Sequence, residues 1–136
     1  IDLIEEQKQR FGFAHAEFFT PDRFLNQGDT VSFGNITLEV YFCPGHTPGH
    51  VSVHISSNGE EALITGDCIH HPVQMTKTHW CSSADFDQNQ GQETRESLLE
   101  SYVDEDILII GTHFATPTAG HVKHHPEGGY WLDVGG

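Results

Sequence analysis

The strongest constraint on the fold is the stretch Cys-Pro-Gly-His-Thr-Pro-Gly-His at residues 43–50. It separates two runs rich in β-branched and aromatic residues, at 36–42 and 51–55, which we expect to form strands. The two Pro-Gly pairs require tight turns, so the backbone must bend sharply around His46. Because a ligand on a stiff loop loses little entropy on binding, this loop predicts a metal site at a strand end.

A second apolar run, Leu-Ile-Thr-Gly-Asp, ends at Asp67. The Asn-Gly pair at residues 58–59 is a strong hairpin signal, and it predicts that the strand at 51–55 pairs with a strand ending at Asp67. In an antiparallel hairpin the start of one strand lies beside the end of the other. We therefore expect the His46 loop and Asp67 to lie at the same edge of the sheet.

A third apolar run, Ile-Leu-Ile-Ile-Gly-Thr-His, covers residues 107–113. The pattern predicts a buried strand at 107–110 that delivers His113 to the sheet edge already holding His46 and Asp67. Simpler functions compete with metal binding at each position. His46 could cap a turn, Asp67 could cap a turn or a helix, and either residue would then have no ligand role.

In order and spacing, these three segments together resemble the metal motifs of the metallo-β-lactamase-fold hydrolases. The resemblance implies that His46 binds one metal ion, that Asp67 bridges two ions, and that His113 binds the second. It implies two zinc ions per complete site, with iron or manganese as alternatives. The fold that it implies is α/β, namely half of an αββα sandwich, with a mixed sheet and a flanking helix.

The chain departs from this family at one important point. The motif His-x-His-x-Asp-His, which the family carries before the Pro-Gly-His-Thr loop, occurs nowhere in the 136 residues. Only His15 lies among the 45 residues that precede His46. We therefore expect residues 1–136 to be a partial domain, the C-terminal half. Its bare sheet face would be covered by a complementary chain or by further copies in a homo-oligomer.

Two further histidines follow Asp67 directly, in Cys-Ile-His-His-Pro-Val-Gln. This region resembles lactonase-like and organophosphate-hydrolase-like enzymes, which place a pocket residue a few positions after the bridging aspartate, and the resemblance implies that His70 acts with Asp67 in catalysis. Either His70 or His71 could contact substrate or orient Asp67, and the alternative is that both are surface loop histidines. His50 is expected to support a ligand or to pack nearby.

The remaining elements follow from local patterns. A helix is predicted at 88–103, beginning after Asp87, with Leu98 and Leu99 on its apolar face. The other predicted elements are the end of a helix at 1–10, a strand at 30–33, and a closing hairpin from 119–123 and 128–134.

The composition of the chain limits the classes of partner that it is expected to bind. The net charge of −14, from six basic and twenty acidic residues, argues against binding to nucleic acid or to anionic membranes. No apolar run approaches the roughly 20 residues of a membrane helix. The three cysteines, Cys43, Cys68 and Cys81, form no close pair in sequence, which favours a reducing, cytoplasmic compartment. Buried inert thiols are the preferred interpretation of Cys43 and Cys68, with a zinc thiolate as the alternative.

The function implied for the complete protein is hydrolysis of a small ester-like substrate, such as a lactone or thioester, by metal-bound hydroxide. Residues 11–50 resemble glyoxalase II-like hydrolases, whereas the chain from Gly66 onward resembles lactonases and organophosphate hydrolases. Two alternatives remain: a non-catalytic metal-binding or interaction fragment, and an iron-binding oxidoreductase variant. With three ligands only, we expect this chain alone to bind metal weakly and to be inactive.

Overall fold

The computed structural model describes residues 8–9, 12–15 and 20–135. The strands are β1 (Thr30–Phe33), β2 (Ile36–Phe42), β3 (Val51–Ser57), β4 (Glu60–Ile64), β5 (Leu108–Ile110), β6 (Ala119–His124) and β7 (Tyr130–Asp133). A 3-10 turn, η1 (Gly66–Cys68), and the helices α2 (Val73–Thr76) and α3 (Gln88–Tyr102) lie between β4 and β5. The helix predicted at 1–10 lies outside the described residues apart from residues 8–9. Within the described part of the chain, no helix combines the length and apolarity needed to cross a bilayer.

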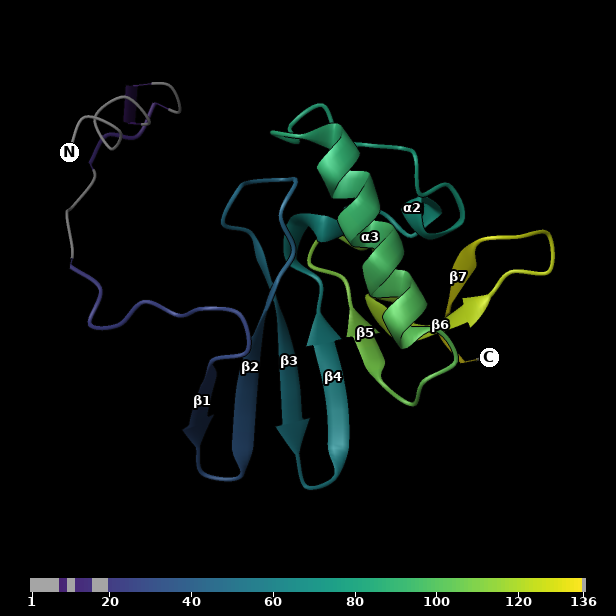
Figure 1. Cartoon of the computed structure of the whole chain (residues 1–136), viewed down its shortest axis with the longest axis horizontal. Helices are drawn as coiled ribbons and strands as arrows, with labels where there is room; N and C mark the ends of the chain where they lie inside the picture. The colour runs from purple at the N-terminus through teal and green to yellow at the C-terminus, as the bar shows by residue number, and fades with distance from the viewer. Residues whose placement is uncertain (1–7, 10–11, 16–19, 136) are drawn as a thin grey trace.

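The strands form one mixed sheet in the order β1-β2-β3-β4-β5-β6-β7. Neighbouring strands are antiparallel except β4 and β5, which are parallel. A parallel pair requires a crossover connection, and η1, α2 and α3 provide it. Helix α3 lies across one face of the sheet (Figure 1). The predicted α/β architecture, a mixed sheet with a flanking helix, is therefore confirmed.

The hairpin between β3 and β4 has the geometry that its sequence predicts. Ser57 pairs with Glu60 across a two-residue turn in which Asn58 and Gly59 both have positive φ, at 53° and 85°. That combination defines a type I′ turn, whose twist matches the flanking strands. The predicted strand ends earlier than expected: β4 stops at Ile64, and Asp67 lies in η1.

Helix α3 begins where the sequence predicts and ends one residue earlier, at Tyr102. The carboxylate of Asp87 accepts a hydrogen bond from the main-chain amide of Gln90 at 3.0 Å, which satisfies one of the free donors of the first turn. The helix buries Leu98 and Leu99 against the sheet. They belong to the main core together with Cys43, Leu63, Cys68, Ile69, Met75, Ile109, Phe114 and Val122.

The opposite face of the sheet, which we call the open face, is apolar. Residues directly paired across strands share a face, and the pairs on this side include Leu38 with Ile55, Val40 with Val53, Phe42 with Val51, and Ile64 with Ile110. None of these residues belongs to the core under α3. Phe42 keeps 48% of its surface exposed, and Phe33 at the sheet edge keeps 55%. An apolar face of this kind normally packs against another layer.

Candidate metal centre

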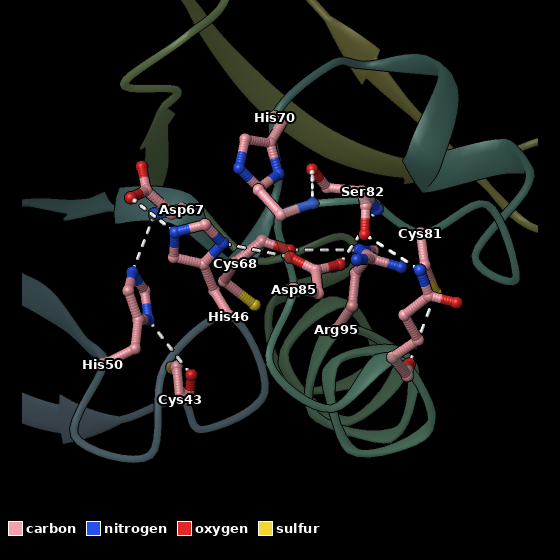
Figure 2. A network of polar contacts seen from close by, with 12 residues as sticks. Cys43, His46, His50, Asp67, Cys68, His70, Cys81, Ser82, Asp85 and Arg95 are labelled. Carbon is pink, nitrogen blue, oxygen red and sulfur yellow. Dashed lines mark hydrogen bonds and ion pairs between the residues drawn. The ribbon is translucent and has the colours of Figure 1, made fainter. Parts of the chain in front are cut away.

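The ends of β2, β4 and β5 bring three ligand-type side chains together at one edge of the sheet. The distance from His46 Nε2 to Asp67 Oδ2 is 3.3 Å, and that from His113 Nε2 to Asp67 Oδ1 is 2.6 Å. The predicted meeting of these residues is therefore confirmed, although their ligation of metal remains a prediction. Figure 2 shows His46 lying between Asp67 and a second carboxylate, that of Asp85.

The two carboxylate oxygens of Asp67 face different imidazoles, and its side chain is one-third exposed. Burial raises the pKa of this carboxyl. The hydrogen bond with His113 and the nearby His46 lower the pKa by more than burial raises it, so the net pKa falls below the usual value. Asp67 is therefore ionised at neutral pH. Each oxygen can serve as an acceptor or ligand on its own side.

His70 completes the cluster. Its ring stacks on His113 with centroids 5.3 Å apart, and it meets the ring of His46 edge-on at 5.1 Å. Its Nδ1 is buried without a hydrogen-bond partner among the described residues. Burial lowers the pKa of His70, which keeps the ring neutral near pH 7. Ligand atoms lie within 4.8 Å of one another in two groups: His46, His70 and Asp85, and Asp67, His70 and His113.

His71 points elsewhere. It is exposed, and its Nδ1 accepts a hydrogen bond from the amide of Val73 at 3.1 Å, at the start of α2. Of the two adjacent histidines, only His70 therefore faces the candidate site. The amides of both residues donate to Oε1 of the buried Gln74, which shapes the chain just after the Asp67 turn.

His50 holds the backbone beneath the cluster. Its Nδ1 contacts the carbonyl oxygen of Cys43 at 3.0 Å, and its Nε2 accepts a hydrogen bond from the amide of Asp67 at 2.7 Å. These two contacts require Nδ1 to carry the proton. Burial lowers the pKa of His50, which agrees with a neutral ring. The arrangement fits the supporting role expected for His50.

The segment that carries His70 is fixed by a buried cation from α3. Arg95 is 1% exposed, yet it hydrogen-bonds no carboxylate among the described residues. Its guanidinium donates to the main-chain carbonyls of Cys68, Thr78 and Trp80. Because a buried charge requires hydrogen-bond partners, these carbonyls and Arg95 depend on one another.

Cys43 and Cys68 are buried free thiols. Ser52 Oγ donates to Cys43 Sγ at 3.2 Å. A hydrogen bond from Cys68 lowers the pKa of Cys43, and the same contact together with burial raises the pKa of Cys68. Neither sulfur belongs to the groups of ligand atoms in the described part of the chain. The structure therefore favours the buried-thiol interpretation over a zinc thiolate.

The sequence analysis missed Asp85. Its Oδ1 lies 3.0 Å from Nδ1 of His46, and its side chain is only 2% exposed. Asp85 lies 39 residues from His46, in a connection that reads as an ordinary turn before α3. The one available signal was an acidic residue just before the helix cap Asp87, which by itself is common at helix starts.

The donor set fits a divalent metal. Imidazole nitrogen and carboxylate oxygen are the usual zinc ligands besides thiolate. A carboxylate with one oxygen directed to each of two histidines has the arrangement that a bridging ligand requires. The mixed sheet brings these side chains together at the ends of its strands. The chain is therefore an α/β domain with a candidate metal site at the strand ends.

The comparison with protein families agrees. Residues 3–113 match the family model described as the metallo-beta-lactamase superfamily. The match covers most of the chain, so the protein belongs to this superfamily.

Among curated proteins, the hydroxyacylglutathione hydrolase GloC of Haemophilus influenzae is 28% identical over 126 residues, covering 90% of this chain and 55% of the relative. A hydroxyacylglutathione hydrolase of Crocosphaera subtropica is 47% identical over 49 residues, 34% of this chain and 19% of the relative. The chain therefore spans about half the length of GloC, and its match to the Crocosphaera protein covers a smaller share, 19%.

Two solved structures share the fold. AidC, a dizinc quorum-quenching lactonase, superposes with a TM-score of 0.72 at 23% identity, covering 84% of this chain and 38% of AidC. The hydrolase AbOPH of the beta-lactamase superfamily superposes with a TM-score of 0.69 at 26% identity, covering 81% of this chain and 37% of AbOPH. At that identity, AidC supports the fold assignment alone.

Proposed function

We propose that this chain is the C-terminal part of a metal-dependent hydrolase that cleaves an ester-like bond, such as a lactone or thioester. The observation that carries the proposal is the placement of the Asp67 carboxylate, with one oxygen toward His46 and the other toward His113. The names of the curated relatives support hydrolysis, since both are called hydroxyacylglutathione hydrolases.

In this proposal His46, Asp67 and His113 would hold two divalent ions, His46 one of them and His113 the other. Zinc is the metal that these nitrogen and oxygen donors suit best. Bound divalent ions activate water near neutral pH and polarise the bond to be cleaved. The remaining work falls to the chain: the neutral His50 fixes the backbone of Asp67, and Asp67 supplies negative charge between the two imidazoles.

His70 is proposed to contact the substrate. Its ring lies against those of both His46 and His113, so a group bound there would be next to both ligand positions. Its buried Nδ1 has no hydrogen-bond partner among the described residues, so the ring has a donor or acceptor that the fold does not use. Since burial keeps the ring neutral, His70 can either donate or accept one hydrogen bond in this position.

Three ligand residues cannot complete two zinc sites, because structural and catalytic zinc ions take at least three protein ligands each. We propose that the chain is one part of a single metallo-β-lactamase domain. A complementary segment carrying His-x-His-x-Asp-His would pack on the open face and supply the other ligands. The apolar pairs on that face and the greater length of the relatives support this arrangement.

Zinc titration by calorimetry tests the ligand assignment. Weak binding is expected for the unaltered chain, and the variants His46→Ala, Asp67→Asn and His113→Ala should each weaken it further. His124→Ala serves as the control because His124 is exposed on β6, away from the cluster. Equal zinc affinity in all four variants would contradict the assignment.

Measurements of substrate turnover and of oligomeric mass test the proposal that the metal site of this chain is incomplete. The chain alone should hydrolyse neither a thioester nor a lactone, and co-expression with a segment bearing the missing motif should restore activity. Two tight zinc sites with turnover in the isolated chain would contradict the proposal. A stable homo-oligomer that does not admit the complementary segment would assign the open face to a second copy instead.

A further inference from the structure

A buried carboxylate, that of Asp85, lies on the side of the His46 ring away from Asp67. Asp85 Oδ1 is 3.0 Å from His46 Nδ1, whereas His46 Nε2 is the nitrogen that faces Asp67. The Asp85 side chain is 2% exposed, so water does not compete for this contact. Figure 2 shows the three side chains in this order, Asp67, His46 and Asp85.

The position of Asp85 is fixed without help from His46's side chain. Its second oxygen, Oδ2, accepts a hydrogen bond from the amide of Ser82 at 2.9 Å. The following main chain is bonded to the metal-site loop, since the amide of Phe86 donates to the carbonyl of His46 at 3.1 Å and that of Asp87 donates to Gly45 at 2.9 Å. The carboxylate is therefore held rigidly against the imidazole.

This geometry determines which nitrogen carries the proton. A carboxylate accepts hydrogen bonds only, so His46 Nδ1 must donate to Asp85. Nε2 of His46 lies 3.3 Å from Asp67 Oδ2, but among the described residues only the Nδ1 contact with Asp85 is a hydrogen bond, so in the neutral ring the lone pair lies on Nε2. A carboxylate behind an imidazole also raises its strength as a ligand.

Asp85 could itself be read as a ligand, because its oxygen lies near His46 and His70. Both of its oxygens are already engaged, one by the imidazole and one by the Ser82 amide. We propose that Asp85 is a positioning residue that keeps the Nε2 lone pair of His46 directed toward the metal. This inference rests on the proposed function, in which His46 is a metal ligand.

Replacement by asparagine isolates this effect with little change in volume. The single oxygen of the amide can accept either from His46 Nδ1 or from the Ser82 amide, and the NH2 group then faces a donor at the other position. When the NH2 group faces His46, the ring must move its proton to Nε2 to accept that bond. Asp85→Asn should therefore move or mix the His46 tautomer.

The test compares Asp85→Asn with Asp87→Asn in the full chain. Asp87 carries the same substitution two residues away, and its side chain accepts from Gln90 at the start of α3, a bond that asparagine retains. Two readouts are taken: zinc affinity by calorimetric titration, and the tautomer of His46 in the metal-free chain by long-range proton–nitrogen NMR.

Zinc affinity should fall about 10- to 100-fold in Asp85→Asn and stay unchanged in Asp87→Asn. In the unaltered chain, NMR should report Nε2 of His46 as the unprotonated nitrogen, and Asp85→Asn should lose that pattern. A preserved tautomer and unchanged affinity in Asp85→Asn, in a chain where His46→Ala weakens zinc binding, would overturn this inference alone. Unchanged affinity in His46→Ala would overturn the proposed function and this inference with it.

Discussion

Gly45 and Gly91 form a direct backbone contact between the metal-site loop and the first turn of α3. A β-carbon at Gly45 would lie 2.3 Å from Cα of Gly91, so the two segments touch with no side chain between them. Thr94 Oγ1 adds a hydrogen bond to the carbonyl of Pro44 at 2.8 Å. The loop bearing His46 therefore takes its position from the helix.

The two glycines should respond differently to alanine. Gly45→Ala should destabilise the fold by about 1–3 kcal/mol from overpacking alone, and φ of +132° at Gly45 adds strain. Gly91→Ala should be neutral or stabilising, because its β-carbon meets nothing closer than 3.8 Å and alanine favours helix. Urea unfolding of both variants measures this difference, and equal midpoints would contradict the contact.

Removal of the His50 side chain should lower the free energy of unfolding, even though His50 is not itself a predicted metal ligand. His50→Ala leaves the carbonyl of Cys43 and the amide of Asp67 without partners, at a cost of about 1–3 kcal/mol for each buried group left unsatisfied. His79→Ala, at an exposed position, should stay within about 0.5 kcal/mol. Denaturant unfolding checks both values, and a loss in His50→Ala as small as the control would contradict the bridging role.

Even a substitution of Arg95 that keeps its positive charge should destabilise the fold. Arg95→Lys replaces a guanidinium that reaches three carbonyls with a single ammonium, and should cost about 1.5–3 kcal/mol for each charged hydrogen bond lost. Arg23→Lys provides the matched control, since Arg23 is exposed and its guanidinium donates to the carbonyl of Thr30. Similar unfolding curves for the two variants would show that the segment carrying His70 does not depend on Arg95.

Alkaline pH should destabilise the fold through its tyrosines. Burial raises the pKa of Tyr102 to about 12, and the hydrogen bond with Glu100 raises that of Tyr130 to about 12, while Tyr41 also shifts upward through burial. The folded-state pKa values exceed the unfolded value of 10.0, so the unfolded chain loses these protons first. Stability should therefore hold below pH 10 and fall as the pH rises through 12.

Tyrosinate absorbance against pH checks this in folded and urea-unfolded samples. The folded chain should titrate at higher pH than the unfolded chain, and Tyr102→Phe should reduce the loss of stability above pH 10. Coincident titration curves would contradict the predicted shifts.

Short-range chemistry made much of the fold predictable. The Asn-Gly turn set the β3–β4 hairpin, and Asp87 marked the start of α3, because both signals act within a few residues. The end of β4 was predicted less well. Gly66 adopts φ of +57° and turns the chain into η1, so the strand stops at Ile64 rather than at Asp67.

The sequence by itself determined the candidate ligands His46, Asp67 and His113, since each follows a strand-forming run that leads to one sheet edge. Only the tertiary structure decided which other side chains contact these ligands. The choice of His70 over His71, and the contact of Asp85 with His46, depend on how the crossover folds back over the loop. Such contacts join residues far apart in the chain, and no local pattern or periodicity encodes them.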